Sequence, residues 1–238
     1  MSTEQRKERL KELLRNKYGE EFEIRELYDN GAVKAWCYPQ KDSLLLFKAG
    51  TMLKMEEISN DDYLQTIACK KIDEELQQPA EKAFCNSLIY SHVDIDNTTG
   101  YITNSAEDTT IKMLTDYYKN RGLSPKITIE VFAIPKAYEE EYLFLSNYIL
   151  KEIVKEDYPQ THINIYFCDE KTIDSAKLAL EEWTWYSSDS TEDIFDIKEG
   201  LKKLELYFDE NGNGYIYSSS KEEFSIDNYK TAREEILK

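Results

Sequence analysis

The feature that most constrains the fold is a strand–helix–strand pattern in the second half of the chain. The runs Lys126–Ile134 (KITIEVFAI) and His162–Cys168 (HINIYFC) are rich in β-branched and aromatic residues, which favour strands. Between them, Tyr138–Lys155 repeats apolar residues at helical spacing, and Pro135 and Pro159 bound it. Parallel strands need a long crossover, usually a helix. The pattern therefore predicts a βαβ unit with two parallel strands.

The first half of the chain predicts an antiparallel-rich arrangement of a helix, three strands, a helix and a strand. Ser2 and Gln5 fit a capping box at the start of the first helix, and Gly19 stands at its usual stop position. The turn Asp29–Gly31 predicts a hairpin, because Asn and Gly tolerate positive φ. In chain order we predict a helix over 2–19, strands at 21–28, 32–38 and 43–49, a helix over 60–78 and a strand at 87–95.

The second half adds helices around the βαβ unit and ends in a hairpin and a helix. Leu204, Leu206 and Phe208 alternate with polar residues, and Tyr215 and Tyr217 do so after an Asn-Gly-rich turn. Further helices are predicted over 106–121, 172–182 and 227–237. The fold class is therefore α+β, with 1–105 as one half and an acidic 106–238 as the other. The halves form two domains or pack as one compact unit.

The charge of the chain argues against two classes of partner. The 238 residues carry a net charge of −17, which opposes nucleic-acid phosphates and anionic lipid. Residues 1–105 have 14 basic and 19 acidic side chains, a net of −5, and residues 106–238 have 16 and 28, a net of −12. No run approaches the ~20 apolar residues of a membrane helix. We expect no nucleic-acid binding and no transmembrane segment, and the charge favours a basic protein as partner.

The sequence predicts neither a targeting segment nor a cofactor. Met1–Lys17 lacks the apolar core of a signal peptide, so a cytoplasmic location is expected. An exported or envelope-associated location is the alternative if a targeting segment has been removed. The sequence contains neither GxGxxG nor a Walker A motif, and its glycines stand at turns.

The segment Asp209–Ile216 (DENGNGYI) matches the opening of an EF-hand loop. Asp209, Asn211 and Asn213 put oxygen ligands at positions one, three and five, and a glycine follows at six. Position twelve is Ser220, where a bidentate glutamate should close the site. Two Asn-Gly pairs between alternating apolar runs are also a strong hairpin signal. The hairpin is the favoured interpretation, and a metal site at these three residues is the alternative.

Motifs of common catalytic sites are missing from the sequence. The chain has 47 acidic residues but no HExxH or similar metal spacing. Its only histidines, His92 and His162, each lie in a strand pattern. Cys168 ends an apolar run, which is typical of a core residue rather than of a nucleophile. The pattern favours a protein without enzymatic activity, and a hydrolase built on scattered carboxylates is the alternative.

Aromatic and acidic residues adjoin one another at 183–196. The three aromatic residues and three of the carboxylates are Trp183, Trp185, Tyr186, Asp189, Asp193 and Asp196. Trp and Tyr are frequent hot spots of protein interfaces. We interpret this segment as a surface for a basic partner, and the alternative is that the three rings close the core under a loop.

The segment Asn16–Ile24 (NKYGEEFEI), followed by a predicted hairpin and LLLFKA, resembles a module of uncharacterised proteins of low-GC Gram-positive bacteria. The resemblance covers about residues 8–80 and implies neither an activity nor site residues, since that group has no settled function. Many of those proteins carry a signal or lipoprotein segment, and Met1–Lys17 has no such pattern.

Together these features predict a non-enzymatic protein-interaction or accessory protein of the immunity or inhibitor type. Its acidic second half would meet a basic partner. The alternative is a carboxylate-based hydrolase or a calcium-binding protein that uses the loop at 209–216.

Overall fold

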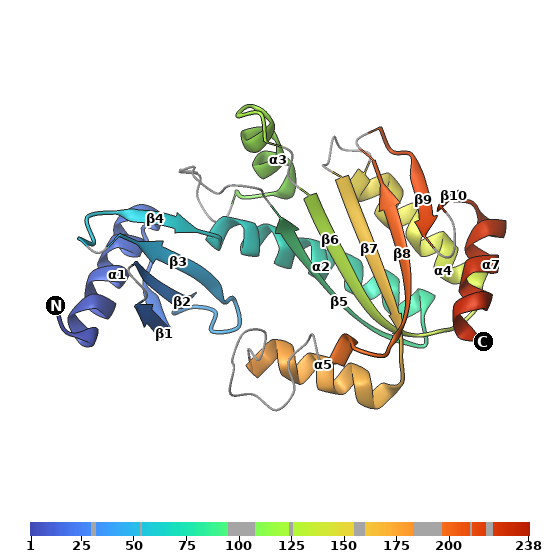
Figure 1. The fold of residues 1–238 in the computed structure, drawn as a ribbon, viewed down its shortest axis with the longest axis horizontal. Helices are drawn as coiled ribbons and strands as arrows, with labels where there is room; N and C mark the ends of the chain where they lie inside the picture. The colour runs from blue at the N-terminus through green and yellow to red at the C-terminus, as the bar shows by residue number, and fades with distance from the viewer. Residues whose placement is uncertain are drawn as a thin grey trace. The chain divides into compact units, whose positions relative to one another are not determined.

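The computed structural model of the protein describes nine stretches of the chain, which form two compact units (Figure 1). Unit 1 consists of the described residues of Met1–Lys70 and Ile95–Leu123, and unit 2 of those of Lys71–Asp94 and Ser124–Lys238. The described stretches are 1–29, 32–52, 54–94, 108–123, 126–154, 160–182, 197–209, 211–217 and 221–238. Each unit combines helices with a sheet, so the predicted α+β class is confirmed. The boundary expected at residue 105 lies outside the described residues.

Unit 1 is built around an antiparallel sheet of four strands in the order β1-β2-β3-β4. The strands are β1 (Phe22–Asp29), β2 (Val33–Pro39), β3 (Phe47–Thr51) and β4 (Ile58–Asp61), and the helices are α1 (Thr3–Tyr18), the start of α2 (Tyr63–Ala83) and α3 (Ile111–Lys119). Ser2 forms the predicted capping box with Gln5, and Gly19 ends α1 in the left-handed conformation. β4 is not predicted from the sequence, because its residues ISND carry no apolar alternation and the strand depends on pairing with β3.

Aromatic rings fill the core of unit 1. Phe22 of β1, Phe47 of β3 and Tyr63 at the start of α2 are almost fully buried, and their ring centroids lie between 4.7 and 5.5 Å apart. Rings of this size contribute much of the apolar area of a core, and Tyr63 also donates its hydroxyl to Glu20. The first turn of α2 is therefore fixed against the sheet.

Unit 2 is built around a six-stranded sheet in the order β10-β9-β8-β7-β6-β5. The crossover between β6 and β7 consists of a short α-helix and a π-helix, and the two strands pair in parallel, which confirms the predicted βαβ unit. The remaining neighbours pair antiparallel, and β8, β9 and α7 form the predicted C-terminal hairpin and helix. The elements are β5 (Asn86–Asp94), β6 (Lys126–Ile134), α4 (Tyr138–Phe144), η1 (Leu145–Val154), β7 (Gln160–Phe167), α5 (Glu170–Glu182), β8 (Lys202–Phe208), β9 (Gly214–Tyr217), β10 (Lys221–Glu223) and α7 (Ile226–Leu237).

The two faces of the unit 2 sheet differ in chemistry. One face is apolar: Ile129, Ile163 and Leu206 follow one another across three strands and are almost fully buried. α7 packs on this face, since Arg233 lies over the ring of Phe167 and α7 contacts β8 and β9. Paired residues of neighbouring strands point to the same side, and successive residues alternate. The opposite side, which we call the polar face, therefore carries the even-numbered residues of β6 and β7.

Helix α5 packs on one half of the polar face. Its apolar residues join three aromatic residues of β5, β6 and β7 in a single buried cluster of Tyr90, Phe132, Tyr166, Ile173, Ala176 and Ala179. The other half of this face, toward β8 and β9, carries polar and aromatic side chains that are half-buried or exposed.

Candidate functional site

The three candidate metal ligands lie in the turn that joins β8 to β9. Oδ1 of Asp209 accepts hydrogen bonds of 2.9 Å from the backbone N–H groups of Asn211 and Asn213, and Oδ2 accepts one of 2.9 Å from Asn213 Nδ2. The hydrogen bond from the Asn213 side chain, above all, lowers the pKa of Asp209. Gly212 has φ 79°, which a glycine adopts without strain. The Asp209 carboxylate thus stabilises the turn with the donors of the loop itself, and calcium binding there stays a prediction.

The predicted aromatic–acidic surface lies outside the described residues, and so do all six of its named members: Trp183, Trp185, Tyr186, Asp189, Asp193 and Asp196. Within the described stretches, no group of three or more His, Cys, Asp or Glu side chains is arranged to hold a metal ion. The helices of those stretches include none with the length and apolar character needed to cross a bilayer.

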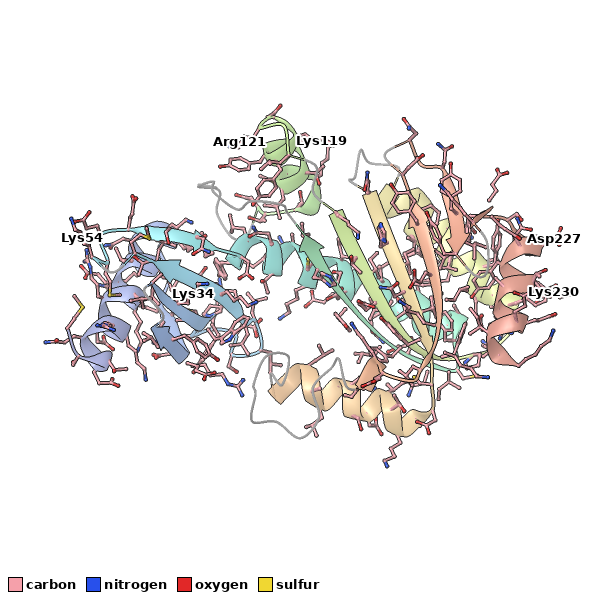
Figure 2. All side chains as sticks on the ribbon, in the orientation of Figure 1. Lys34, Lys54, Lys119, Arg121, Asp227 and Lys230 are labelled. Carbon is pink, nitrogen blue, oxygen red and sulfur yellow. The ribbon has the colours of Figure 1, made fainter. Side chains whose placement is uncertain are left out.

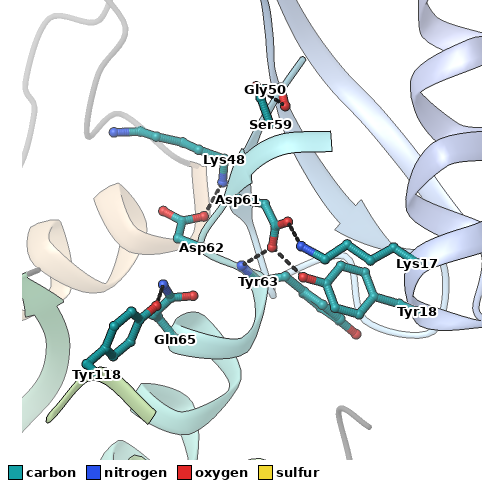
Figure 3. Close-up of polar contacts among 10 residues, drawn as sticks. All are labelled: Lys17, Tyr18, Lys48, Gly50, Ser59, Asp61, Asp62, Tyr63, Gln65 and Tyr118. Atoms are coloured by element: carbon teal, nitrogen blue, oxygen red, sulfur yellow. Dashed lines mark hydrogen bonds and ion pairs between the residues drawn. The ribbon is translucent and has the colours of Figure 1, made fainter. Parts of the chain in front are cut away.

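A buried polar cluster in unit 1 surrounds Asp61, the last residue of β4 (Figure 3). The Asp61 side chain is 2% exposed, and its Oδ2 accepts a hydrogen bond of 2.6 Å from Lys17 Nζ. Its Oδ1 accepts hydrogen bonds from the Tyr18 hydroxyl at 2.5 Å and the Tyr63 N–H at 3.2 Å. Burial and then the charge of Asp61 raise the pKa of Tyr18 well above its usual value. The cluster ties α1 to the start of α2, and both carboxylate oxygens are engaged in doing so.

Whereas Asp61 binds α1 and the start of α2, the next residue, Asp62, forms its hydrogen bonds with β3. Its N–H donates to the carbonyl of Lys48 at 3.1 Å, and its Oδ1 accepts from the N–H of Lys48 at 2.5 Å. Burial raises the pKa of Asp62 to about 7, and the nearby charge of Asp61 adds to this increase, whereas the contacts with Lys48 oppose it. Asp62 is therefore a group of unit 1 that changes its charge near neutral pH.

Unit 2 contains a second buried carboxylate, Glu141 of α4, which is fully buried. Arg233 of α7 binds both of its oxygens, with Nε 2.6 Å from Oε2 and Nη2 3.0 Å from Oε1. The Tyr229 hydroxyl donates to Oε2 at 2.9 Å, and the N–H of Lys136 donates to Oε1 at 2.8 Å. A bidentate guanidinium pair is among the strongest charge-assisted arrangements. Glu141 therefore fastens the C-terminal helix to the βαβ crossover.

A third carboxylate, Glu130 of β6, lies at the centre of the polar face and is 4% exposed. Lys198 Nζ lies 3.0 Å from its Oε1 and between the rings of Tyr90 and Tyr166, at 5.2 and 5.5 Å from their centroids. Burial and then the charge of Glu130 raise the pKa of Tyr166. This ion pair holds residues 197–200, which precede β8, on the sheet.

The two histidines of the chain belong to one row across the polar face. His92 of β5 pairs with Thr128 of β6, which pairs with His162 of β7, and the row continues through Tyr207 of β8 to Tyr215 of β9. The rings of His162 and Tyr207 meet edge to face at 4.7 Å. The sequence predicts the two histidines only as residues of separate strands. The two histidines share a row only through the register of three strands. The signal in the sequence that could have shown this is the alternation of inward and outward residues along each strand.

Cys168 was considered as a nucleophile and is half-buried. Its Sγ lies 3.9 Å from the carbonyl oxygen of Ala133, and burial raises the pKa of Cys168 to about 11. Because the thiolate is the reactive form of cysteine, this environment suits a packing residue. Cys37 and Cys69 of unit 1 are buried, whereas Cys85 is exposed.

Exposed carboxylates outnumber exposed lysines on residues 136–140 and 221–238 of unit 2, which we call the acidic surface. Asp227 and Lys230 extend from α7 in Figure 2. Arg233 is engaged with Glu141, which leaves four lysines, at 136, 221, 230 and 238, against seven exposed carboxylates. The carboxylates are those of Glu139, Glu140, Glu222, Glu223, Asp227, Glu234 and Glu235.

Comparison with known proteins establishes the fold and no function. No protein-family model matches the chain, and no curated protein matches it significantly. Among solved structures, the fold is similar to the crystal structure of a DUF5037 family protein from Ruminococcus gnavus ATCC 29149. The TM-score is 0.66, the sequence identity is 21%, and the match covers 96% of this chain and 98% of that one.

Proposed function

We propose that this chain is a non-enzymatic binding protein, an accessory or inhibitor of the immunity type, whose acidic second unit recognises a basic protein. The observation that carries the proposal is the distribution of carboxylates in unit 2. Glu130 and Glu141, which are almost fully buried, are matched by Lys198 and Arg233, so they serve the fold. On the acidic surface, by contrast, seven exposed carboxylates stand beside only four lysines, so this surface carries a net negative charge.

Charge of this kind favours a partner with lysines and arginines for two reasons. It accelerates the encounter with a basic surface, and it disfavours acidic competitors. The effect is screened over about 10 Å at roughly 0.1 M salt, so it depends on ionic strength. The carboxylates of α7 stand on a helix fixed by the Glu141–Arg233 pair, and those of β10 stand on a strand paired with β9. A fixed array of charges loses little order on binding.

The test is a calorimetric titration with a peptide of about 16 residues rich in Arg and Lys, at low and at moderate salt. We expect binding that weakens as salt is added, and about tenfold weaker binding after Glu222→Gln with Glu223→Gln. The matched control is Glu56→Gln with Glu57→Gln, which removes two exposed charges from unit 1. Equal losses in both variants, or no binding of the cationic peptide, would overturn the proposal.

A further inference from the structure

Three strands at one edge of the unit 2 sheet, β8, β9 and β10, carry half-buried and exposed side chains on the polar face (Figure 1). We propose that this part of the face binds a second copy of the chain, with β9 lying over β9 of the copy. We call it the β9 surface, and its members are Glu205, Tyr207, Tyr215, Tyr217, Lys221 and Glu223. This self-association goes beyond the proposed function, because it does not depend on a basic partner.

The register of the strands arranges these residues in an ordered pattern. They form two rows across β8, β9 and β10: Glu205, Tyr217 and Lys221 in one, and Tyr207, Tyr215 and Glu223 in the next. Residues that pair across neighbouring strands point to the same side of the sheet. The central tyrosine of the first row, Tyr217, is 38% exposed, so the surface is accessible. Each row thus has a tyrosine in its middle and a charge on β10.

The charges of this face balance one another. Lys203 forms an ion pair with Glu205 on β8, and the two side chains are 38% and 45% exposed, so water keeps this pair weak. Lys221 Nζ lies 3.8 Å from the centroid of the Tyr215 ring. With Glu223, the described residues of the three strands carry two lysines and two glutamates on this side. A partner of one charge would leave two like charges unmatched, and an apolar partner would bury all four without their hydration. The fitting partner carries both signs in the matching order.

A two-fold axis along β9 makes the surface complementary to itself. Such a rotation keeps the direction of the strands and reverses their order, so β8 of one copy lies over β10 of the other. Glu205 of each copy then faces Lys221 of the other, and Tyr207 of each copy faces Glu223 of the other. Tyr217 lies on the axis and faces its own counterpart. Sheets pack face to face about 10 Å apart, a distance that a glutamate and a lysine together span.

The position of α5 selects this axis. α5 covers the other half of the polar face, where it packs on aromatic residues of β5, β6 and β7. Because the strand order is reversed, α5 of each copy faces the space beyond β10 of the other copy. An axis across the strands would instead set α5 against α5 and hold the two sheets apart. α7 packs on the apolar face, so its carboxylates stay accessible in the dimer.

The size of the surface and the charge of the chain determine the conditions of the test. A patch three strands wide is smaller than the ~800 Å² per partner of a stable complex, so the association is weak and reversible. The net charge of −17 on each copy opposes association. This repulsion is screened over about 8 Å at roughly 0.15 M salt, which is therefore the condition to use.

Sedimentation equilibrium over a range of protein concentrations measures the association. We expect the mass of the wild type to rise with concentration from one chain toward two. Glu205→Lys and Lys221→Glu should each weaken the association at least about tenfold, because each sets like charges opposite one another twice. Glu205→Lys also lowers the net negative charge of the chain, so overall repulsion cannot explain its loss of association. A wild type that stays monomeric would overturn the inference.

A mixture of the two variants is the decisive measurement. In a mixed dimer, the lysine introduced at position 205 faces the glutamate introduced at position 221, and the native Lys221 faces the native Glu205. The mixture should therefore associate about as tightly as the wild type, although neither variant does so alone. A mixture that stays monomeric, or wild-type association of either variant by itself, contradicts the proposed arrangement.

Glu222→Lys is the matched control. Glu222 pairs with Ile216 and so points to the other side of the sheet, and its reversal changes the net charge as Glu205→Lys does. It should leave the association intact, and a loss equal to that of Glu205→Lys would assign the contact to another surface. A circular-dichroism melt confirms the folding of each variant. If a reversal unfolds unit 2, Tyr217→Ser tests the same contact without a change of charge and should weaken the association about tenfold.

Discussion

In unit 1, Asp61 is buried beside Lys17 and Tyr18, and in unit 2, Glu141 is buried beside Arg233 and Tyr229. Each site combines a carboxylate, a cation and a phenol. The exposed fractions of the carboxylate side chains are alike, 2% for Asp61 and 0% for Glu141. The partners differ in number and kind.

Arginine binds both oxygens of Glu141, and a backbone N–H and a hydroxyl complete the set. Lysine binds a single oxygen of Asp61, and a second carboxylate, Asp62, follows at once. When all polar groups of a buried cluster are paired, removal of one group is costly, because its partners stay buried without a hydrogen bond or counter-charge. Beside Asp61, it is Asp62 whose raised pKa makes unit 1 sensitive to pH. The two sites therefore hold their units together in different ways, and substitutions can test this.

The largest effect is expected for Glu141→Ala. It leaves the Arg233 guanidinium and the Tyr229 hydroxyl buried without their acceptor, which should cost about 4 kcal/mol in the free energy of unfolding of unit 2. Urea denaturation followed by fluorescence measures it. Glu140→Gln is the control, since its pair with Lys136 is exposed and should contribute less than about 0.5 kcal/mol. Similar costs for both variants would contradict the central role of Glu141.

Asp61→Asn should have a smaller effect, a loss of about 2 kcal/mol in unit 1. Asparagine keeps an acceptor for the Tyr63 N–H but no longer neutralises Lys17, whose side chain is 16% exposed and so keeps some access to water. Adding Lys17→Met completes a double-mutant cycle, and the coupling energy isolates the ion pair. A coupling near zero would mean that Asp61 acts through Tyr18 and the helix start alone.

Asp62→Asn should change the pH dependence of unit 1. The unfolded chain has an aspartate pKa of about 3.9, and the folded pKa of Asp62 is about 7, so the folded state holds the proton more tightly. The stability that Asp62 contributes is complete below about pH 4 and is lost as the pH rises through 7. The variant should therefore be more stable than the wild type by about 1 to 2 kcal/mol near pH 8, after allowance for solvent screening of a half-buried group.

Thermal unfolding of the wild type and of Asp62→Asn, followed by signals from unit 1 between about pH 4 and pH 8, measures this difference in stability. Asp42→Asn is the control of opposite sign. Burial would raise the pKa of Asp42, but its bonds with Lys70 and the backbone outweigh burial, and its pKa is lowered. Asp42 therefore stabilises the folded state above its unfolded pKa and stops doing so as the pH falls. A flat difference between Asp62→Asn and the wild type would contradict the assignment.

The sequence predicted elements whose signals are local and missed those that depend on pairing. Lys126–Ile134 forms a strand in almost any context, so the βαβ unit could be predicted from three runs of residues. β4 has only Ile58 as an apolar anchor, and its strand exists because β3 pairs with it. The same holds for side chains: Glu141 and Arg233 stand 92 residues apart, and no local pattern links them.

The candidate sites follow the same division. The turn at Asp209 was predictable because its donors lie within four residues, and Asn211 and Asn213 belong to this turn. The row of Tyr207, Tyr215 and Glu223 on the polar face was not predicted, because these residues come together only through the register of three strands. The sequence could show the alternation of each strand but not which residues stand opposite one another.

The smallest effect is expected for Asp209→Ala. Unlike Glu141 and Asp61, Asp209 is neither paired with a cation at short range nor deeply buried. It should lower the melting temperature of unit 2 slightly at neutral pH, by less than Asp61→Asn lowers that of unit 1, because the turn loses three hydrogen bonds. The pKa of Asp209 is lowered, so its contribution exists above the unfolded pKa of about 3.9 and is lost as the pH falls through the folded value. The difference between variant and wild type should therefore vanish in acid.

Adding calcium at roughly millimolar concentration distinguishes the two interpretations of the loop. If calcium raises the melting temperature of the wild type but not that of Asp209→Ala, these residues form an ion site. An unchanged melting temperature would leave Asp209 as the acceptor that closes the hairpin.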